Sequence, residues 1–127
     1  MDKIRRGNIL CIDLGERPGT HLQSGRRPCV VVSTDKANRS AKIYTVIPGT
    51  TKHEKEGFPV HCKLLPEEVK GYLNKETIFL AEQICTVDEK QVICKMGNIL
   101  QDSRTMQKIN QIMIRQLALE DEVVRGK

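Results

Sequence analysis

The fold is organised around one short stretch, Pro28-Cys29-Val30-Val31-Val32-Ser33, in which a run of four apolar residues follows a proline. A continuous apolar run is typical of a strand that is buried on both faces, whereas a half-exposed strand alternates. Pro28 also holds the two preceding arginines, Arg26 and Arg27, at the entrance of this strand. We therefore predict that residues 28–33 form the central strand of the molecule.

Further short strands are predicted on either side of this central strand, because apolar residues recur in short runs separated by turn residues. We expect them at Ile9–Leu14, at Lys42–Ile47 after a turn at Asp35–Ser40, at Phe58–Leu64 with His61 and Lys63 facing solvent, and between residues 76 and 96 with a break at Asp88–Lys90. Gly49–Gly57 is expected to be a charged loop. Short strands without a long helix between them indicate a small antiparallel barrel.

A helix is predicted near the end of the chain, capped by Asp102 or Ser103. Its apolar residues share one side: Met106, Ile109, Met113 and Leu117, with Ile112 and Leu119 widening the stripe. We expect this helix to pack on the barrel or on a second subunit. A chain of 127 residues fits one domain, which we place at residues 1–119, followed by a charged, flexible tail at residues 120–127.

The charge of the chain is concentrated in its first half. Residues 1–63 contain 12 Lys and Arg against 6 Asp and Glu, whereas residues 64–127 contain 9 against 10. Such a basic half attracts polyanions, although a merely soluble basic surface accounts for the charge equally well. Only 3% of residues are aromatic and none is Trp, which weakens any interpretation based on base stacking.

The five cysteines are odd in number and widely spaced, at Cys11, Cys29, Cys62, Cys85 and Cys94. Several of them lie within apolar runs, so the pattern indicates free, buried thiols in a reducing cytosol. No C-x-x-C pair is present, and the three histidines do not fall at zinc-site spacings, so no metal site is expected. The basic start of the chain leads into a strand pattern rather than a long apolar segment, which predicts a cytoplasmic protein without a signal peptide or membrane span.

Candidate chemistry lies in the loop Thr20–Pro28. Arg27 can bind two phosphate oxygens through its planar donors, or it can form a structural ion pair with Asp13, Glu16 or Glu82. Arg26 is the weaker candidate of the two arginines. His21 can carry a proton to or from a ribose hydroxyl, or it can be a plain surface residue. Gln23 can orient a phosphate or only stabilise the loop.

A second candidate segment follows the sequence Pro48-Gly49. Thr50 and Thr51 can offer hydroxyls and backbone N–H groups to an anion, or they can satisfy the local backbone as turn threonines usually do. Lys52, His53 and Lys55 form a cationic rim that can follow a nucleic-acid backbone. Carboxylates do not cluster anywhere as a Mg²⁺ cage. Phosphodiester chemistry at this site would therefore be metal-free, which favours RNA with its own 2′-hydroxyl as nucleophile.

At these residues the sequence resembles the MazF/PemK family of toxin endoribonucleases from bacterial toxin–antitoxin modules. The resemblance is carried by collinear segments that cover nearly the whole chain: Arg6-Gly7-Asn8-Ile9 with Asp13-Leu14, Gln23–Val32, Asn38-Arg39-Ser40, Val46–Thr51, Phe58–His61 and Leu80–Asp88. The Gln23–Val32 segment, with Gly25 and an Arg-Pro pair entering a valine-rich strand, is the most diagnostic of them.

The resemblance implies an SH3-like barrel with a C-terminal helix, a homodimer, an antitoxin partner and metal-free, sequence-specific cleavage of single-stranded mRNA without a cofactor. It makes Arg27 the phosphate-stabilising arginine and Thr50 the active-site threonine, and it places His21 where some members carry a histidine proposed for acid–base catalysis. Leu22 departs from the pattern, because many members have glutamate there and that general base is absent. Whether Thr50 or Thr51 meets the phosphate stays open.

Two alternatives do not require RNA cleavage. This barrel type also resembles the CcdB toxins, which act on DNA gyrase by protein contact. A nucleic-acid-binding module without catalysis would be distinguished by salt-sensitive RNA binding with no cleavage.

Overall fold

The structure is a computed structural model that describes residues 3–119, apart from the side chain of His53. The tail expected at residues 120–127 lies outside the described residues. Along the chain the elements are β1 (Asn8–Asp13), β2 (Arg26–Val31), α1 (Asp35–Ala41), β3 (Ile43–Thr50), η1 (His53–Lys55), β4 (His61–Leu64), η2 (Pro66–Glu68), β5 (Lys70–Gly71), β6 (Thr77–Leu80), η3 (Ala81–Gln83), β7 (Cys85–Asp88), η4 (Glu89–Gln91), β8 (Val92–Asn98) and α2 (Arg104–Leu117), where η marks a short 3-10 helix.

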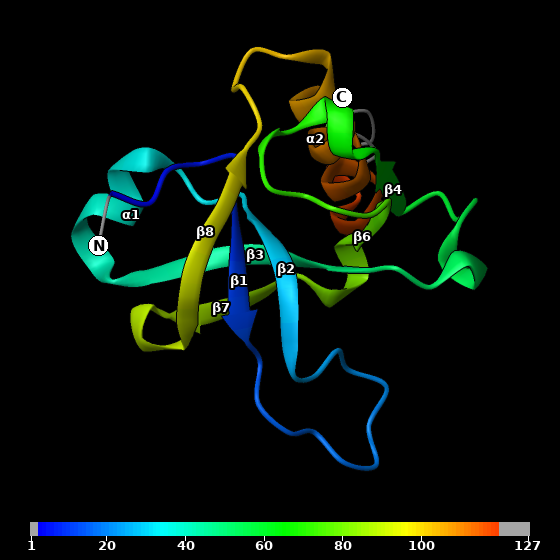
Figure 1. Cartoon of the computed structure of the whole chain (residues 1–127), viewed down its shortest axis with the longest axis horizontal. Helices are drawn as coiled ribbons and strands as arrows, with labels where there is room; N and C mark the ends of the chain where they lie inside the picture. Colours follow the sequence, from blue (N-terminus) through cyan, green and yellow to red (C-terminus); the bar gives the residue numbers. More distant parts are fainter. Residues whose placement is uncertain (1–2, 120–127) are drawn as a thin grey trace.

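The strands form one curved, antiparallel half-barrel. Their order is β4-β6-β3-β2-β1-β8-β5, and β7 pairs with the first half of β3. Every strand pair in the described part of the chain is antiparallel. Helix α2 lies against the part of the sheet that contains β4 and β6, at the other end of the molecule from α1 (Figure 1). The prediction of a small antiparallel β fold with a C-terminal helix is confirmed.

Strand β2 lies in the middle of the sheet and is covered on both faces, as predicted. Val30 packs into the hydrophobic cluster between the sheet and α2, together with Phe79 and Met106. Cys29 and Val31, which point the other way, belong to a second cluster on the opposite face. The continuous apolar run therefore reflects a strand that divides two cores.

Helix α2 is attached to the sheet by an apolar stripe and by one arginine. Ser103 is the cap, since its Oγ accepts a hydrogen bond from the Met106 N–H, and the stripe residues Met106, Ile109 and Ile112 are buried. Arg6, just before β1, donates from Nε to the Val32 carbonyl and from its terminal nitrogens to the side chains of Asn110 and Gln101. The expectation that this helix packs on the barrel is correct.

The segment Asp35–Ala41 is helix α1 and not the turn that the sequence suggested. Thr34 caps it by accepting a hydrogen bond from the Ala37 N–H. Asn38 is the only buried residue of this seven-residue helix. A helix this short and polar has no apolar stripe, so periodicity cannot reveal it.

Strand β3 is longer than predicted, because it continues through Pro48 and Gly49 to Thr50. Gly49 permits a close approach of β6 here: a Cβ at this position would lie 2.6 Å from Cγ2 of Thr77. The glycine therefore marks strand packing rather than a turn. Pro48 lies opposite Cys29 in the β2–β3 register.

Strand β4 begins at His61, so the predicted strand start at Phe58 is wrong. Lys63 faces solvent as expected, but the His61 side chain is only 5% exposed. Alternation along the strand suggested a polar face for His61. The ring is instead covered because it lies between a carboxylate and a backbone carbonyl.

Candidate functional site

The β1–β2 loop is a long excursion from the sheet that is closed at its base (Figure 1). The Leu14 N–H donates to the Gly25 carbonyl, and the Gly25 N–H donates to the Gly15 carbonyl, both at 2.9 Å. Gly15 and Gly25 have φ angles of 80° and 70°, which favour glycine. These bonds extend the β1–β2 hairpin, so the loop leaves and re-enters the sheet at one fixed point.

Arg27 lies in β2 directly after this neck and is half-buried. Its Nε donates to the Ser24 carbonyl at 2.9 Å, which orients the guanidinium toward the loop. Among the residues that the structure describes, no carboxylate lies within ion-pair distance of Arg27, and Glu82 pairs with His61. The structural ion pair considered from the sequence is therefore not formed, and the terminal nitrogens remain available to an anion.

Thr50 ends β3, the strand that pairs with β2. The β2–β3 register ends with Cys29 paired to Pro48, so Arg27 lies two residues before the last paired residue of β2 and Thr50 two residues after its partner in β3. Thr50 is 2% exposed, and its Oγ1 accepts a hydrogen bond from the Lys52 N–H at 3.3 Å. The threonine thus satisfies local backbone, as turn threonines do, at the end of β3.

Of the three residues of the predicted cationic rim, the structure describes the side chains of Lys52 and Lys55. Thr51 and Lys52 are exposed immediately after β3. Lys55 ends η1 half-buried, and its carbonyl is bound by His61. The His53 side chain lies outside the described part of the structure.

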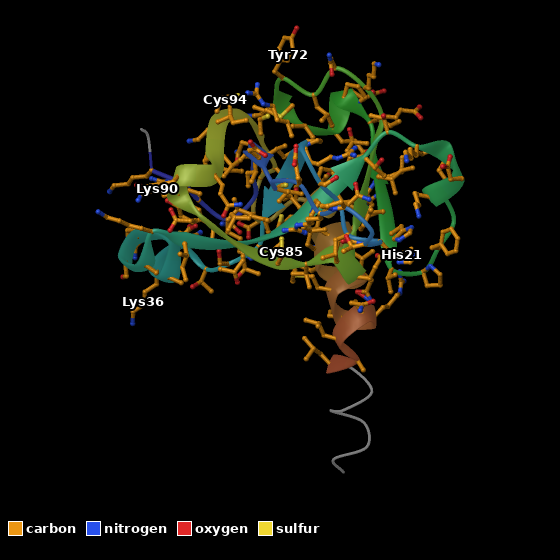
Figure 2. All side chains as sticks on the ribbon, turned by 90° about the horizontal axis from the view of Figure 1, so that it is seen from below. His21, Lys36, Tyr72, Cys85, Lys90 and Cys94 are labelled. Carbon is orange, nitrogen blue, oxygen red and sulfur yellow. The ribbon has the colours of Figure 1, made fainter. Side chains whose placement is uncertain are left out.

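His21 and Gln23 lie in the β1–β2 loop, and both are tied to Gln83 through their backbones. The His21 residue is exposed, on the side of the molecule opposite Lys36 and Lys90 (Figure 2). In the described part of the chain, Gln23 Oε1 is the one buried side-chain nitrogen or oxygen without a hydrogen-bond partner. Such an orphaned buried acceptor is costly unless a donor reaches it.

Within the loop is a cavity of about 630 Å³. Its lining combines basic, acidic and small residues: Asp13, Gly15, Glu16, Arg17, Pro18, Ser24, Gly25 and Arg26. Arg26 was a candidate from the sequence, whereas Arg17 was not, although it is a basic residue in the same candidate loop region. Burial raises the pKa of the neighbouring Cys85 thiol, while Arg17 opposes that rise.

Two further residues near the site, Gln83 and His61, were not identified as functional from the sequence. Gln83 bonds the β1–β2 loop, and His61 bonds both Lys55 and Glu82. The available signal was the pair Glu82-Gln83 directly after the buried strand β6. That signal does not say which distant segments the pair would reach.

The five cysteines are free, as predicted, but the predicted burial is wrong for Cys94, which is exposed, and for Cys11 and Cys85, which are half-buried. Cys29 and Cys62 are buried, and burial raises the pKa of the Cys62 thiol to about 11. In residues 3–119 the side chains of His, Cys, Asp and Glu form no group of three or more that could hold a metal ion. Within the same range, no helix has the length and apolar character needed to cross a membrane.

Known proteins with this architecture include solved structures from two bacterial groups. An endoribonuclease from Mycobacterial species matches with a TM-score of 0.70 and 21% identity over 93% of this chain and 94% of that one. A second, described as an endoribonuclease in complex with its cognate antitoxin from Mycobacterial species, matches at 0.73 and 22% over 91% and 96%. MazF from Deinococcus radiodurans matches at 0.73 and 18% over 93% and 99%.

These structural similarities show the fold. The family follows from the sequence, because the family model for the PemK-like, MazF-like toxin of type II toxin–antitoxin systems matches residues 5–117. That range spans every described strand and helix. The chain therefore belongs to the PemK-like, MazF-like toxins of type II toxin–antitoxin systems.

Proposed function

We propose that this toxin is a sequence-specific, metal-independent endoribonuclease that cleaves single-stranded mRNA and thereby inhibits growth. One observation carries the proposal: the Arg27 guanidinium is fixed at Nε by the Ser24 carbonyl and has no carboxylate partner in the described structure. Arg27 also lies two residues before Cys29, whose strand partner Pro48 lies two residues before Thr50. A fixed cation without a counter-ion, at the neck of the long β1–β2 loop, is suited to a phosphodiester. Structural neighbours that are named endoribonucleases support the same activity.

In this proposal Arg27 binds the scissile phosphate through its terminal nitrogens. Negative charge grows on the non-bridging oxygens as the ribose 2′-oxygen attacks phosphorus, and a preorganised donor is worth ~3–4 kcal/mol at that stage. The bond between phosphorus and the 5′-oxygen then breaks. The products are a 2′,3′-cyclic phosphate and a 5′-hydroxyl.

The neighbouring polar residues complete the site. Thr50 donates a hydrogen bond to the phosphate, with Thr51 next to it at the exposed start of the β3–β4 loop. His21 supplies an imidazole for one of the two proton transfers, either from the 2′-hydroxyl or to the 5′-oxygen. Gln23 offers its unpartnered carbonyl oxygen to RNA. Arg26, Lys52, His53 and Lys55 contribute charge along the RNA backbone.

Partners and compartment follow from the same activity. A structural neighbour is described in complex with its cognate antitoxin, and we assign an antitoxin to this chain as well, with an acidic or amphipathic tail that covers the RNA-binding loops. A homodimer in the cytoplasm is the proposed working form, since mRNA is the substrate and the five thiols are free.

The proposal is tested by incubating the purified protein with a long RNA in excess EDTA and mapping the ends. Cleavage that persists under chelation, with cyclic phosphate and 5′-hydroxyl ends, is expected. Cleavage that disappears with chelation would contradict metal independence. Intact RNA under all conditions, including added divalent cations, would contradict the nuclease assignment and favour one of the two alternatives without cleavage.

A further inference from the structure

The short helix η3 (Ala81–Gln83) is anchored to the body of the molecule between the two candidate RNA-facing loops. Ala81 is 1% exposed, and its N–H donates to the Val60 carbonyl at 3.0 Å. The helix closes with the Ile84 N–H bonded to the Ala81 carbonyl at 3.1 Å. The two residues after Ala81, Glu82 and Gln83, therefore start from a fixed base.

Gln83 binds the β1–β2 loop with both ends of its amide. Its Oε1 accepts from the Gln23 N–H at 3.2 Å, and its Nε2 donates to the His21 carbonyl at 3.1 Å. The other hydrogen bonds described for residues 18–23 stay within the loop, between Thr20 and its neighbours. Gln83 thus fixes residues 21–23 of this loop through hydrogen bonds to their backbone.

Glu82 holds the second loop through His61. The His61 Nε2 lies 2.9 and 2.7 Å from the two Glu82 carboxylate oxygens, and Nδ1 lies 2.7 Å from the Lys55 carbonyl. A carbonyl only accepts hydrogen bonds, so Nδ1 donates to Lys55, while Nε2 lies against the Glu82 carboxylate. The ring is nearly covered, at 5% side-chain exposure. This chain of contacts connects η3 to the end of η1 in the β3–β4 loop.

We propose that Glu82, Gln83 and His61 form a clasp, here called the η3 clasp, that holds both loops in the geometry that accepts RNA. The role in RNA cleavage rests on the proposed function, whereas the ordering of the loops does not. The members of the η3 clasp are positioning residues, because they act through backbone groups of the loops. Without the clasp, RNA must order the loops when it binds, which weakens binding more than chemistry. Arg27 keeps its own bond to Ser24 in either case.

The Gln83 arm is tested with Gln83→Met, which has a similar length and no amide. Gln83→Glu keeps the acceptor for Gln23 and loses the donor to His21. The matched control is Gln101→Met, which removes another glutamine-to-backbone bond, from Nε2 to the Arg6 carbonyl, far from the loops. The first readout is amide hydrogen exchange of the free protein.

For Gln83→Met we expect the Gln23 amide to exchange roughly tenfold faster or more, with a smaller change in Gln83→Glu and no change in residues 18–23 of Gln101→Met. Unchanged protection of Gln23 in Gln83→Met would overturn this arm. For RNA cleavage we expect KM to rise roughly tenfold in Gln83→Met with kcat within about twofold. A fall in kcat at constant KM would also overturn it, since it would place Gln83 on the reacting groups.

The Glu82 arm is tested with Glu82→Gln, against Glu68→Gln as a control that neutralises the partner of Lys108 in an ion pair of the same 2.7 Å length. Faster exchange confined to residues 51–57 in Glu82→Gln is expected. Equal loosening of the whole sheet, or no change at residues 51–57, would overturn a positioning role. Because exchange is measured without RNA, a wild-type protein that cleaves no RNA would contradict the proposed function and leave the clasp to be decided by exchange alone.

Discussion

Two arginines at the sheet, Arg6 and Arg27, differ in how many of their side-chain donors the fold satisfies. Arg6 precedes β1, and all three of its side-chain nitrogens have partners: the Val32 carbonyl, Gln101 and Asn110. Arg27 is the second residue of β2, near the loop, where its Nε donates to the Ser24 carbonyl and its terminal nitrogens have no described partner. The donors of Arg6 are all used to hold α2 against the sheet, whereas the terminal nitrogens of Arg27 are free to bind a ligand.

The largest effect is expected from Arg27→Ala. Removal of a donor that acts on the transition state should reduce kcat by ~10²–10³. Thermal stability should change little, because only one bond to a loop carbonyl is lost. Single-turnover RNA cleavage and thermal unfolding measure the two quantities, and near-normal turnover would place Arg27 with the structural arginines.

Arg6→Met should show the opposite profile. It leaves the Val32 carbonyl and two side-chain amides without their charged donor, which should lower the free energy of unfolding by about 2–3 kcal/mol. Turnover at a temperature where the variant is folded should stay near wild type. Urea denaturation gives the stability, and a large loss of kcat in the folded variant would break the comparison.

Thr50→Val and Thr51→Val test which threonine hydroxyl contacts the phosphate that Arg27 is proposed to bind. Thr50 ends β3, two residues after the strand partner of Cys29, and in the proposed mechanism it binds the phosphate held by Arg27. Loss of its hydroxyl should therefore slow cleavage roughly tenfold, the effect of one hydrogen bond to a charged group. Thr51 is exposed one residue further and should matter less. Equal rates in Thr50→Val and wild type, with slowed Thr51→Val, would assign the phosphate contact to Thr51.

The smallest effect is expected at Lys108 of α2, which forms an ion pair with Glu68 of η2 at 2.7 Å. Burial alone would raise the pKa of Glu68, but hydrogen bonds from Lys108 and the Leu65 N–H outweigh it and hold that pKa below its usual value. Because the folded-state pKa is lowered, this pair stabilises the fold above the usual glutamate pKa, and the contribution is lost as pH falls through the lowered value.

Lys108→Met should therefore cost about 0.2–1 kcal/mol at neutral pH and less in acid. Urea titrations at several pH values measure the difference, with Lys70→Met as an exposed control. A loss that is independent of pH would show that the pair contributes packing rather than charge.

Much of the fold was predictable because its signals are local. The continuous run Cys29–Val32 predicted a strand covered on both faces, and the stripe of α2 predicted its packing. The position of Arg27 before Pro28 likewise predicted its place at a strand entrance. Helix α1 was missed because its polar residues carry no period, and Gly49 suggested a turn where it permits close packing with β6.

The candidate site was predictable only as a set of residue types. Each candidate was identified separately and had a purely structural alternative; the candidates are Arg27, Thr50, His21 and Gln23. Arg27 does not pair with Glu82, because Glu82 instead binds His61, a histidine that the strand pattern predicted to face solvent. No local pattern reveals that exchange of partners.

The sequence by itself determined the central strand, most of the other strands along the chain, the C-terminal helix and the family. Only the tertiary structure decided which arginine is saturated and which is open, and which side chains join the two loops. The physical reason is distance along the chain. Gln83 reaches Gln23 across 60 residues, and Arg6 reaches Asn110 across 104. Strand and helix patterns depend on neighbours a few residues apart, whereas hydrogen-bond saturation depends on which distant groups the fold brings within reach.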